Sequence, residues 1–169
     1  MERSVTMKGT PLALSGNELK VGAKAPDFSV VDNNLAPVGP SAYKDKVKVI
    51  LAVPSLDTPV CDIETRRFNQ EAGKLGDDVA VLTISMDLPF AQKRWCGAAG
   101  ISHVTTLSDY KDASFGLAYG VLIKELRLLA RAVFVVDKDN TLKYIEIVGD
   151  ITHEPDYDAC LKAVGGCLK

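Results

Sequence analysis

The chemistry of this chain is expected to centre on Cys61, which ends the stretch V-P-S-L-D-T-P-V-C (residues 53–61). Thr58 is a good N-cap and Pro59 suits the first helical position, so Cys61 should occupy the third position of a helix. The unpaired N–H groups and the dipole of a helix start favour negative charge, and a thiol placed there should lose its proton more easily than a free thiol. The pattern predicts an activated cysteine.

A buried structural thiol is the alternative interpretation of Cys61, since free cysteine is among the most buried residue types. The preceding segment favours the reactive role. Residues 47–53, V-K-V-I-L-A-V, are rich in β-branched side chains and predict a buried strand. This strand should end at Pro54, because proline cannot donate to a sheet ladder. A cysteine in the first turn of a helix that follows such a strand is seldom placed for packing alone.

Two further residues are candidates for the same chemistry. Cys96 is expected on the helix after the next strand, where composition alone favours a core cysteine on an amphipathic helix. Arg131 comes directly before the apolar run A-V-F-V-V-D, where a solvated arginine is the ordinary interpretation. A cation near a sulfur favours the thiolate. Arg66 and Arg67, on the helix of Cys61, are rival candidates for that cation.

Length, composition and charge restrict the class of protein. A chain of 169 residues with 47% hydrophobic and 25% charged residues fits one globular domain, which we expect to span residues 1–169. The net charge of −2 gives no support for nucleic-acid binding. No apolar run is long enough to predict a membrane span, and the N-terminal residues M-E-R-S-V-T-M-K-G lack the apolar stretch of a signal peptide. We therefore expect a cytoplasmic protein.

The four cysteines are not expected to form a structural disulfide framework in that compartment. The chain has no C-x-x-C pair and only two histidines, so the ligand spacing of a zinc site is absent and no metal or cofactor is predicted. Cys160 is expected in the core of a closing helix. Cys167 follows two glycines and is expected to be more exposed.

Apolar runs and turn residues predict an alternation of strands and helices. After the central strand and the Cys61 helix, the expected elements are a strand over 79–85, a helix from Pro89 closed by Gly97 and Gly100, a strand over 104–107, a helical segment over 112–119, an antiparallel pair over 132–137 and 141–148, and a helix over 154–164 stopped by Gly165 and Gly166. A short hairpin is expected around residues 10–17. This order is typical of an α/β fold with a mixed sheet.

The motif Pro54-x-x-x-Thr58-x-x-Cys61 resembles the active-site motif of the peroxiredoxins. The segment S-M-D-L-P-F-A-Q-K-R-W-C-G (residues 85–97) is similar to the segment that carries the resolving cysteine in bacterial thiol peroxidases, the atypical two-cysteine peroxiredoxins. The resemblance extends over residues 10–159. It implies a thioredoxin-like fold, in which helices flank a mixed central sheet and a β-hairpin is added at the N-terminus.

The resemblance also implies roles for particular residues. Cys61 would reduce hydrogen peroxide and alkyl hydroperoxides, and Cys96 would resolve its sulfenic acid in an intrachain Cys61–Cys96 disulfide that thioredoxin opens. Arg131 would approach the sulfur, Thr58 would orient the thiolate and the peroxide, and Pro54 would shield the sulfur from water. Local unwinding around one or both cysteines is expected, since cysteines on separate intact helices need not satisfy disulfide geometry. Family members commonly form homodimers.

One stretch departs from the family pattern. The residues V-L-I-K-E-L-R-L-L-A (121–130) contain no glycine, whereas the family usually has a glycine-containing connection before the arginine. Two other functions remain alternatives to the peroxidase. A thiol–disulfide oxidoreductase acting on proteins is disfavoured by the missing C-x-x-C pair, and a redox-sensing or binding module would need no turnover at Cys61.

Overall fold

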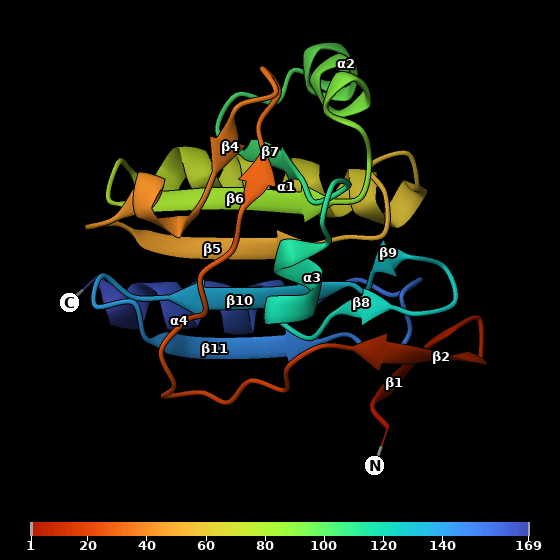
Figure 1. Ribbon diagram of the computed structural model, residues 1–169. Coiled ribbons are helices and arrows are strands. Elements are labelled where there is room, and N and C mark those ends of the chain that lie inside the picture. The colour runs from red at the N-terminus through yellow and green to blue at the C-terminus, as the bar shows by residue number, and fades with distance from the viewer. Residues whose placement is uncertain (1, 169) are drawn as a thin grey trace.

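Within residues 2–168, which the computed structural model describes, seven strands form one mixed sheet through the middle of the molecule (Figure 1). Their order is β11-β10-β5-β6-β7-β3-β4, with β5, β6 and β7 parallel and β10 antiparallel to both of its neighbours. The expected α/β class is confirmed. The strands are β3 (Val30–Val31), β4 (Pro37–Val38), β5 (Val47–Ala52), β6 (Val79–Ser85), β7 (Thr105–Ser108), β10 (Ala132–Val136) and β11 (Leu142–Ile147).

Helices cover both faces of this sheet (Figure 1). α1 (Pro59–Leu75) and α4 (Tyr157–Cys167) lie together on one face, and α3 (Ser114–Ala118) lies on the other. α2 (Pro89–Ala99) contacts β7, and a short 3₁₀ helix, η1 (Pro40–Tyr43), precedes β5. α1 and α2 follow the carboxyl ends of the parallel strands β5 and β6, so the helices that carry Cys61 and Cys96 start at the same edge of the sheet.

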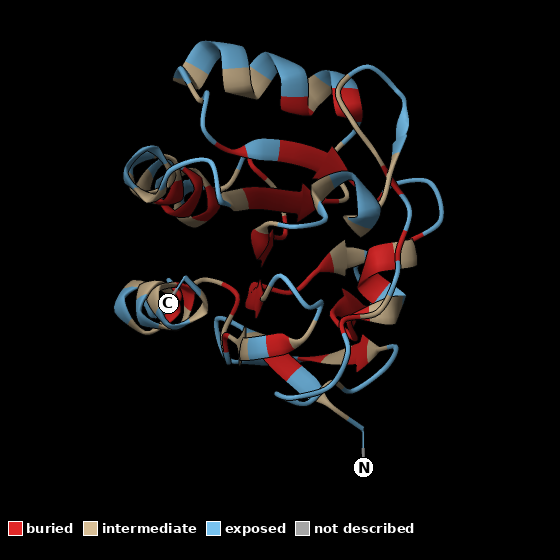
Figure 2. Cartoon of the chain, turned by 90° about the vertical axis from the view of Figure 1, so that its left-hand side faces the viewer, coloured by how far each residue is buried: buried red, intermediate tan, exposed pale blue. Residues whose placement is uncertain are grey.

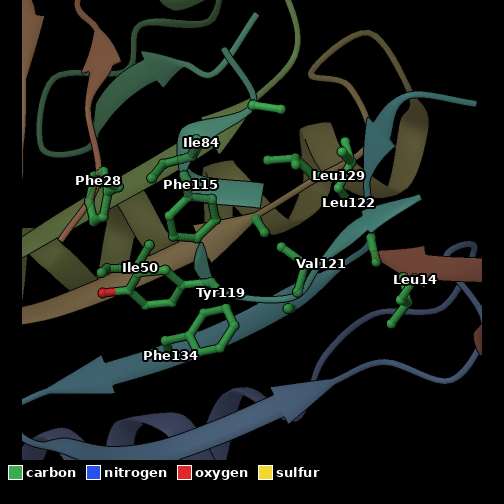
Figure 3. Packing of buried hydrophobic residues seen from close by; sticks show 14 of the residues in the cluster. Leu14, Phe28, Ile50, Ile84, Phe115, Tyr119, Val121, Leu122, Leu129 and Phe134 are labelled. Carbon is green, nitrogen blue, oxygen red and sulfur yellow. The ribbon is translucent and has the colours of Figure 1, made fainter. Parts of the chain in front are cut away.

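The core has two main parts, one on each face of β5, and every residue of β5 is buried. This explains why the strand reads as a continuous apolar run rather than an alternating one. Buried residues gather in the interior of the molecule, while the outer sides of the helices are exposed (Figure 2). On the α3 side Phe115 and Tyr119 stack with ring centroids 4.5 Å apart, and Phe28 meets Phe115 edge-on at 5.2 Å (Figure 3). On the opposite side Phe68 of α1 and Cys160 of α4 join the second cluster.

A second, small sheet lies at one end of the molecule, with strand order β1-β2-β8-β9. Its strands are β1 (Ser4–Met7), β2 (Thr10–Ser15), β8 (Leu122–Ile123) and β9 (Leu128–Leu129). An N-terminal hairpin is therefore present, but its turn is at Lys8 and Gly9, and residues 10–15 form only its second strand. β8 and β9 lie in the glycine-free stretch and were not predicted, because strands of two residues carry no periodicity.

Two helices end later than their glycines predicted. α2 continues through Gly97 and stops at Gly100, whose φ of 68° is the left-handed conformation that glycine adopts without strain. α4 begins at Tyr157, after the N-cap Asp156, and runs through Gly165 and Gly166 to Cys167. A glycine inside a helix costs only about 1 kcal/mol relative to alanine, so packing overrides it. The predicted ends at Gly97, Gly165 and Gly166 were wrong for this reason, whereas the predicted stop of α2 at Gly100 is confirmed.

Candidate active site

Cys61 is the third residue of α1, as the capping pattern predicted. Thr58 has the extended backbone of an N-cap, with φ −91° and ψ 148°, and Pro59 opens the helix. The Cys61 side chain is 0% exposed and packs with Val53 and Leu56, and the partly buried Trp95 of α2 lies against this small cluster. The sulfur is thus held at the start of α1, in a cluster that Trp95 of α2 contacts.

Arg131 reaches this sulfur. Its Nη2 donates a hydrogen bond to Cys61 Sγ at 3.2 Å, although the two residues are 70 positions apart in the chain. Burial is nearly complete, since Arg131 is 1% exposed. The rival arginines lie elsewhere, because Arg66 pairs with Asp62 on the exposed side of α1 and Arg67 pairs with Glu71. A buried guanidinium that donates to sulfur stabilises the thiolate relative to the thiol.

The guanidinium is held from two directions. Nη1 donates to Glu64 Oε2 at 2.7 Å, and Nε and Nη2 donate to the carbonyl oxygen of Ile151 at 3.0 and 2.8 Å. These bonds fix the plane of the side chain against Cys61. Neither partner of Arg131 was predicted from the sequence. A carboxylate one helical turn after Cys61 was an available signal for Glu64, whereas nothing in a sequence marks a backbone acceptor at residue 151.

Glu64 is an ionisable group in an apolar setting, with 0% exposure. Burial raises the pKa of Glu64 to about 7, and the neighbouring Arg131 opposes this rise. Its second oxygen, Oε1, has no hydrogen-bond partner within the described part of the chain. The pair with Arg131 is therefore a buried ion pair in which desolvation competes with attraction.

Thr58 caps α1 by its backbone but not by its side chain. The hydroxyl donates to the carbonyl oxygen of Ser55 at 3.0 Å instead of accepting from an N–H of the helix. The predicted N-cap position is therefore confirmed, while the local turn from Ser55 to Thr58 takes the hydroxyl away from the helix N–H groups. Pro54, the other loop residue of the motif, is buried where β5 ends. Both residues lie on the loop that leads to Cys61.

A hollow of about 450 Å³ opens beside this loop. Arg131 forms part of the wall of this hollow and also donates to Cys61 Sγ. The sulfur therefore lies directly behind the part of the wall that Arg131 forms. Most of the remaining wall is apolar, with contributions from the N-terminal hairpin and from the glycine-free stretch. The wall includes Met7, Pro54, Thr58, Val60, Leu126 and Leu128.

Cys96 lies on α2 in different surroundings. Its Sγ is 3.4 Å from the Thr106 hydroxyl oxygen, and burial raises the pKa of this thiol while the Thr106 hydrogen bond opposes the rise. All four cysteines, each within residues 2–168, are free thiols. Trp95, the neighbour of Cys96, is the residue of α2 that packs against the Cys61 cluster. The structure therefore brings Arg131 and Thr58 close to Cys61, but it does not join Cys61 to Cys96.

The remaining cysteines lie away from this site. Cys160 is buried in the core as predicted, and burial raises the pKa of its thiol to about 12. Cys167 is half-buried at the end of α4. Within residues 2–168, no group of histidine, cysteine, aspartate or glutamate side chains has the arrangement of a metal site, and no helix is long and apolar enough to cross a membrane.

Comparisons with known proteins agree with this arrangement. The Redoxin family model matches residues 20–161. The thiol peroxidase of Halalkalibacterium halodurans is 55% identical over 165 residues, covering 98% of this chain and 99% of the relative, and that of Bacillus subtilis is 54% identical over 165 residues, covering 98% of each. A solved peroxiredoxin-like protein from Aquifex aeolicus superposes with a TM-score of 0.91 at 45% identity, covering 99% of this chain and 98% of that one.

Proposed function

Since the chain belongs to the redoxin family and is a thiol-dependent peroxidase, we propose that Cys61 is its peroxidatic cysteine. The observation that carries this assignment is the 3.2 Å contact between Arg131 Nη2 and Cys61 Sγ at the start of α1. A thiolate, not a thiol, is the nucleophile in sulfur chemistry. Of the four thiols, Cys61 has both a helix N-terminus and a buried guanidinium beside it.

In the first step the Cys61 thiolate attacks the terminal, proton-bearing oxygen of a hydroperoxide. The S–O bond forms as the O–O bond breaks, and the leaving alkoxide or hydroxide takes a proton from solvent to become an alcohol or water. Cys61 is oxidised by two electrons to a sulfenic acid, and the peroxide is reduced by the same two. Arg131 donates to the sulfur and to the peroxide oxygens, where negative charge develops.

Thr58 and Pro54 act on the same step from the loop before α1. The Thr58 hydroxyl orients the thiolate and the peroxide, and turning it from the Ser55 carbonyl oxygen towards the hollow requires only a side-chain rotation. Pro54 covers the sulfur and limits access of water. Because Cys61 is 0% exposed, a peroxide reaches it from the hollow only when these side chains shift.

Cys96 resolves the sulfenic acid in the second step. Its sulfur attacks Cys61 Sγ, the S–S bond forms, and the sulfenic oxygen leaves as water with the proton of the thiol. The pairing requires α2 to unwind around Cys96, since that sulfur contacts Thr106 while both helices are intact. The second half of α2 carries no fully buried side chain, which favours such unwinding.

The substrates are hydrogen peroxide and alkyl hydroperoxides. The apolar wall of the hollow supports the second class, because an alkyl group gains free energy when it leaves water for such a wall. Leu126 and Leu128, from the glycine-free stretch, set the shape of this wall. The relatives do not favour the alternative functions of a thiol–disulfide oxidoreductase or a sensor.

Thioredoxin is proposed as the reductant that opens the Cys61–Cys96 disulfide by thiol–disulfide exchange, and a homodimer as the assembly, both on the family resemblance. We propose a cytoplasmic location, which free thiols suit because that compartment is reducing. Residues 1–169 would then act as one catalytic domain without a cofactor.

The test is cysteine replacement followed by single-turnover kinetics. Cys61→Ser is expected to abolish peroxide consumption, and Cys96→Ser to consume one equivalent and then stop in the presence of thioredoxin. Cys160→Ser serves as the matched control and should turn over normally. Mass mapping of the oxidised wild-type protein should find Cys61 joined to Cys96. Full turnover by Cys61→Ser, or recycling by Cys96→Ser, would overturn the assignments.

A further inference from the structure

A carboxylate connects the loop before α1 with the loop before α2. Asp87 stands two residues before α2, in the loop after β6. Its Oδ1 accepts a hydrogen bond from Ser55 Oγ at 2.7 Å, and its Oδ2 accepts from the backbone N–H of Leu56 at 2.9 Å. Ser55 and Leu56 belong to the loop before α1. The Asp87 side chain, in the loop before α2, therefore holds the loop before α1 in place.

The contacts of Asp87 continue into the site around Cys61. The carbonyl oxygen of Ser55 accepts the hydrogen bond from the Thr58 hydroxyl, and Leu56, which is 2% exposed, packs against Cys61. A displacement of Ser55 and Leu56 would move both the Thr58 hydroxyl and one side of the sulfur pocket. Displacements of about 1 Å can cost a hundredfold in rate when a reacting group is misplaced.

The same carboxylate is tied to the elements under α2. Ser85 Oγ donates to Asp87 Oδ2 at 2.7 Å, and Ser108 Oγ donates to the Asp87 carbonyl oxygen. Gln92, in the second turn of α2, is 1% exposed and donates to Ser85 Oγ at 3.0 Å. The start of α2 is thus fixed to β6 and β7 through a network that includes Asp87.

We propose that Asp87 is a positioning residue that couples the two steps of the reaction. With its bonds to Ser55 and Leu56 in place, the loop before α1 has the arrangement needed for peroxide reduction at Cys61. The bond from Ser85 to the same carboxylate, with the bond from Gln92 to Ser85, anchors the first turns of α2, and this anchor keeps the second half, with Cys96 at Thr106, folded. This inference rests on the proposed roles of Cys61 and Cys96. It predicts that weakening Asp87 affects the two steps in opposite directions.

The experiment uses Asp87→Asn, which keeps the shape of the side chain but replaces one acceptor oxygen with a donor. The single tryptophan, Trp95, lies against the Cys61 cluster and reports both steps as stopped-flow fluorescence phases. The first, peroxide-dependent rate should fall about tenfold or more, since hydrogen bonds to a charged group are stronger than neutral ones. The second, peroxide-independent rate of disulfide formation should rise by about twofold to fivefold as α2 is released.

Asp57→Asn is the matched control, because it removes a negative charge from the exposed part of the same loop. Asp57 makes no side-chain hydrogen bond within residues 2–168. The rates of both phases in Asp57→Asn should therefore equal those of the wild type. Ser55→Ala provides a second, milder variant in case Asp87→Asn does not fold, as judged by circular dichroism. It removes one bond to Asp87 and should shift both rates in the same two directions by smaller factors.

Equal slowing of both phases in the folded variants, or an unchanged first phase, would overturn the coupling role. Failure of the proposed function looks different. In that case the wild-type protein would show no Cys61-dependent first phase, or Cys61→Ser would retain it, whatever the behaviour of Asp87→Asn. The two ideas are therefore separated by the same set of proteins.

Discussion

The surroundings of Cys61 and Cys96 differ, although the two residues lie on neighbouring helices of the same protein. Cys61 is 0% exposed, at the start of the 17-residue helix α1, and contacts a buried guanidinium. Cys96 is half-buried in the second half of the 11-residue helix α2 and contacts the neutral hydroxyl of Thr106. The first setting suits the nucleophile proposed at Cys61, and the second keeps the Cys96 thiol, whose pKa is raised by burial, on the segment proposed to unwind.

The difference follows from what each half-reaction requires. Attack on a peroxide needs a stabilised thiolate and donors in place before the reaction, which a buried network supplies. Formation of the disulfide needs the second sulfur to travel, and a mobile segment must be drawn from the less stable parts of a fold. In α2 the buried side chains are Pro89 and Gln92, both in its first half, so we expect the second half to unwind more readily than the first.

Removing the positive charge of Arg131 should have the largest effect on the difference between the Cys61 and Cys96 sites. Arg131→Met deletes the donor to Cys61, so we expect the rate of the first step to fall by about a hundredfold to a thousandfold. The variant also leaves Glu64 buried without its partner, which should cost about 3 kcal/mol of stability. The measurements are single-turnover oxidation and urea unfolding.

The double variant Arg131→Met/Glu64→Leu separates these two consequences. It removes the orphaned carboxyl group and should recover much of the lost stability, while the first step stays slow. Recovery of the rate together with the stability would mean that Arg131 acts only as a structural residue, and the contrast between the two cysteines would lose its electrostatic basis.

The pH dependence of stability should reveal the buried pair near Cys61. The pKa of Glu64 is raised from 4.5 to about 7, so between these values the folded protein binds more protons than the unfolded chain. Stability must then fall as pH rises through this window. We expect wild-type protein to lose about 2–4 kcal/mol over this range relative to Glu64→Gln, in urea unfolding at several pH values. Asp62→Asn, on the exposed side of α1, is the control, and superimposable profiles for wild type and Glu64→Gln would contradict the prediction.

A single substitution in α2, Gly97→Ala, should affect the step assigned to Cys96. Gly97 is inside the helix, and a Cβ atom added there meets no heavy atom within 4 Å. Gly97→Ala should stabilise the folded form of α2 by about 1 kcal/mol, and therefore slow disulfide formation by about fivefold without changing peroxide reduction. Stopped-flow fluorescence measures both rates. Slowing of the peroxide-dependent step instead would show that the second half of α2 takes part in the first reaction.

Much of the Cys61 site could be predicted because its determinants are local. The strand before Pro54, the cap at Thr58 and the position of Cys61 all follow from short-range rules of propensity and capping. The role of Arg131 could be inferred only from the family resemblance, since its contact with Cys61 spans 70 residues of sequence. The hollow was missed because it depends on which elements pack together. Glu64 had a local signal in its place one turn after Cys61, but its contact with Arg131 spans 67 residues of sequence.

The wrongly predicted helix ends also show that local sequence preferences do not include tertiary packing. Gly97, Gly165 and Gly166 are weak helix formers, and local preference placed helix ends at each of them. The structure keeps all three inside helices, since the tertiary packing of an amphipathic face contributes more than one unfavourable residue costs. Sequence propensity therefore identified the main helices and strands, although not β8 and β9, and it failed at the ends that depend on these three glycines.

The carbonyl oxygen of Ile151 has a consequence for how this enzyme tolerates mutation. It accepts two hydrogen bonds from Arg131, and an acceptor on the main chain is present whatever side chain the residue carries. Point mutations at position 151 cannot delete it; only a shift of the whole segment can. The orientation of the Arg131 guanidinium toward Cys61 therefore does not depend on the side chain at position 151. Its other hydrogen-bond partner is the side chain of Glu64, which a single substitution can remove.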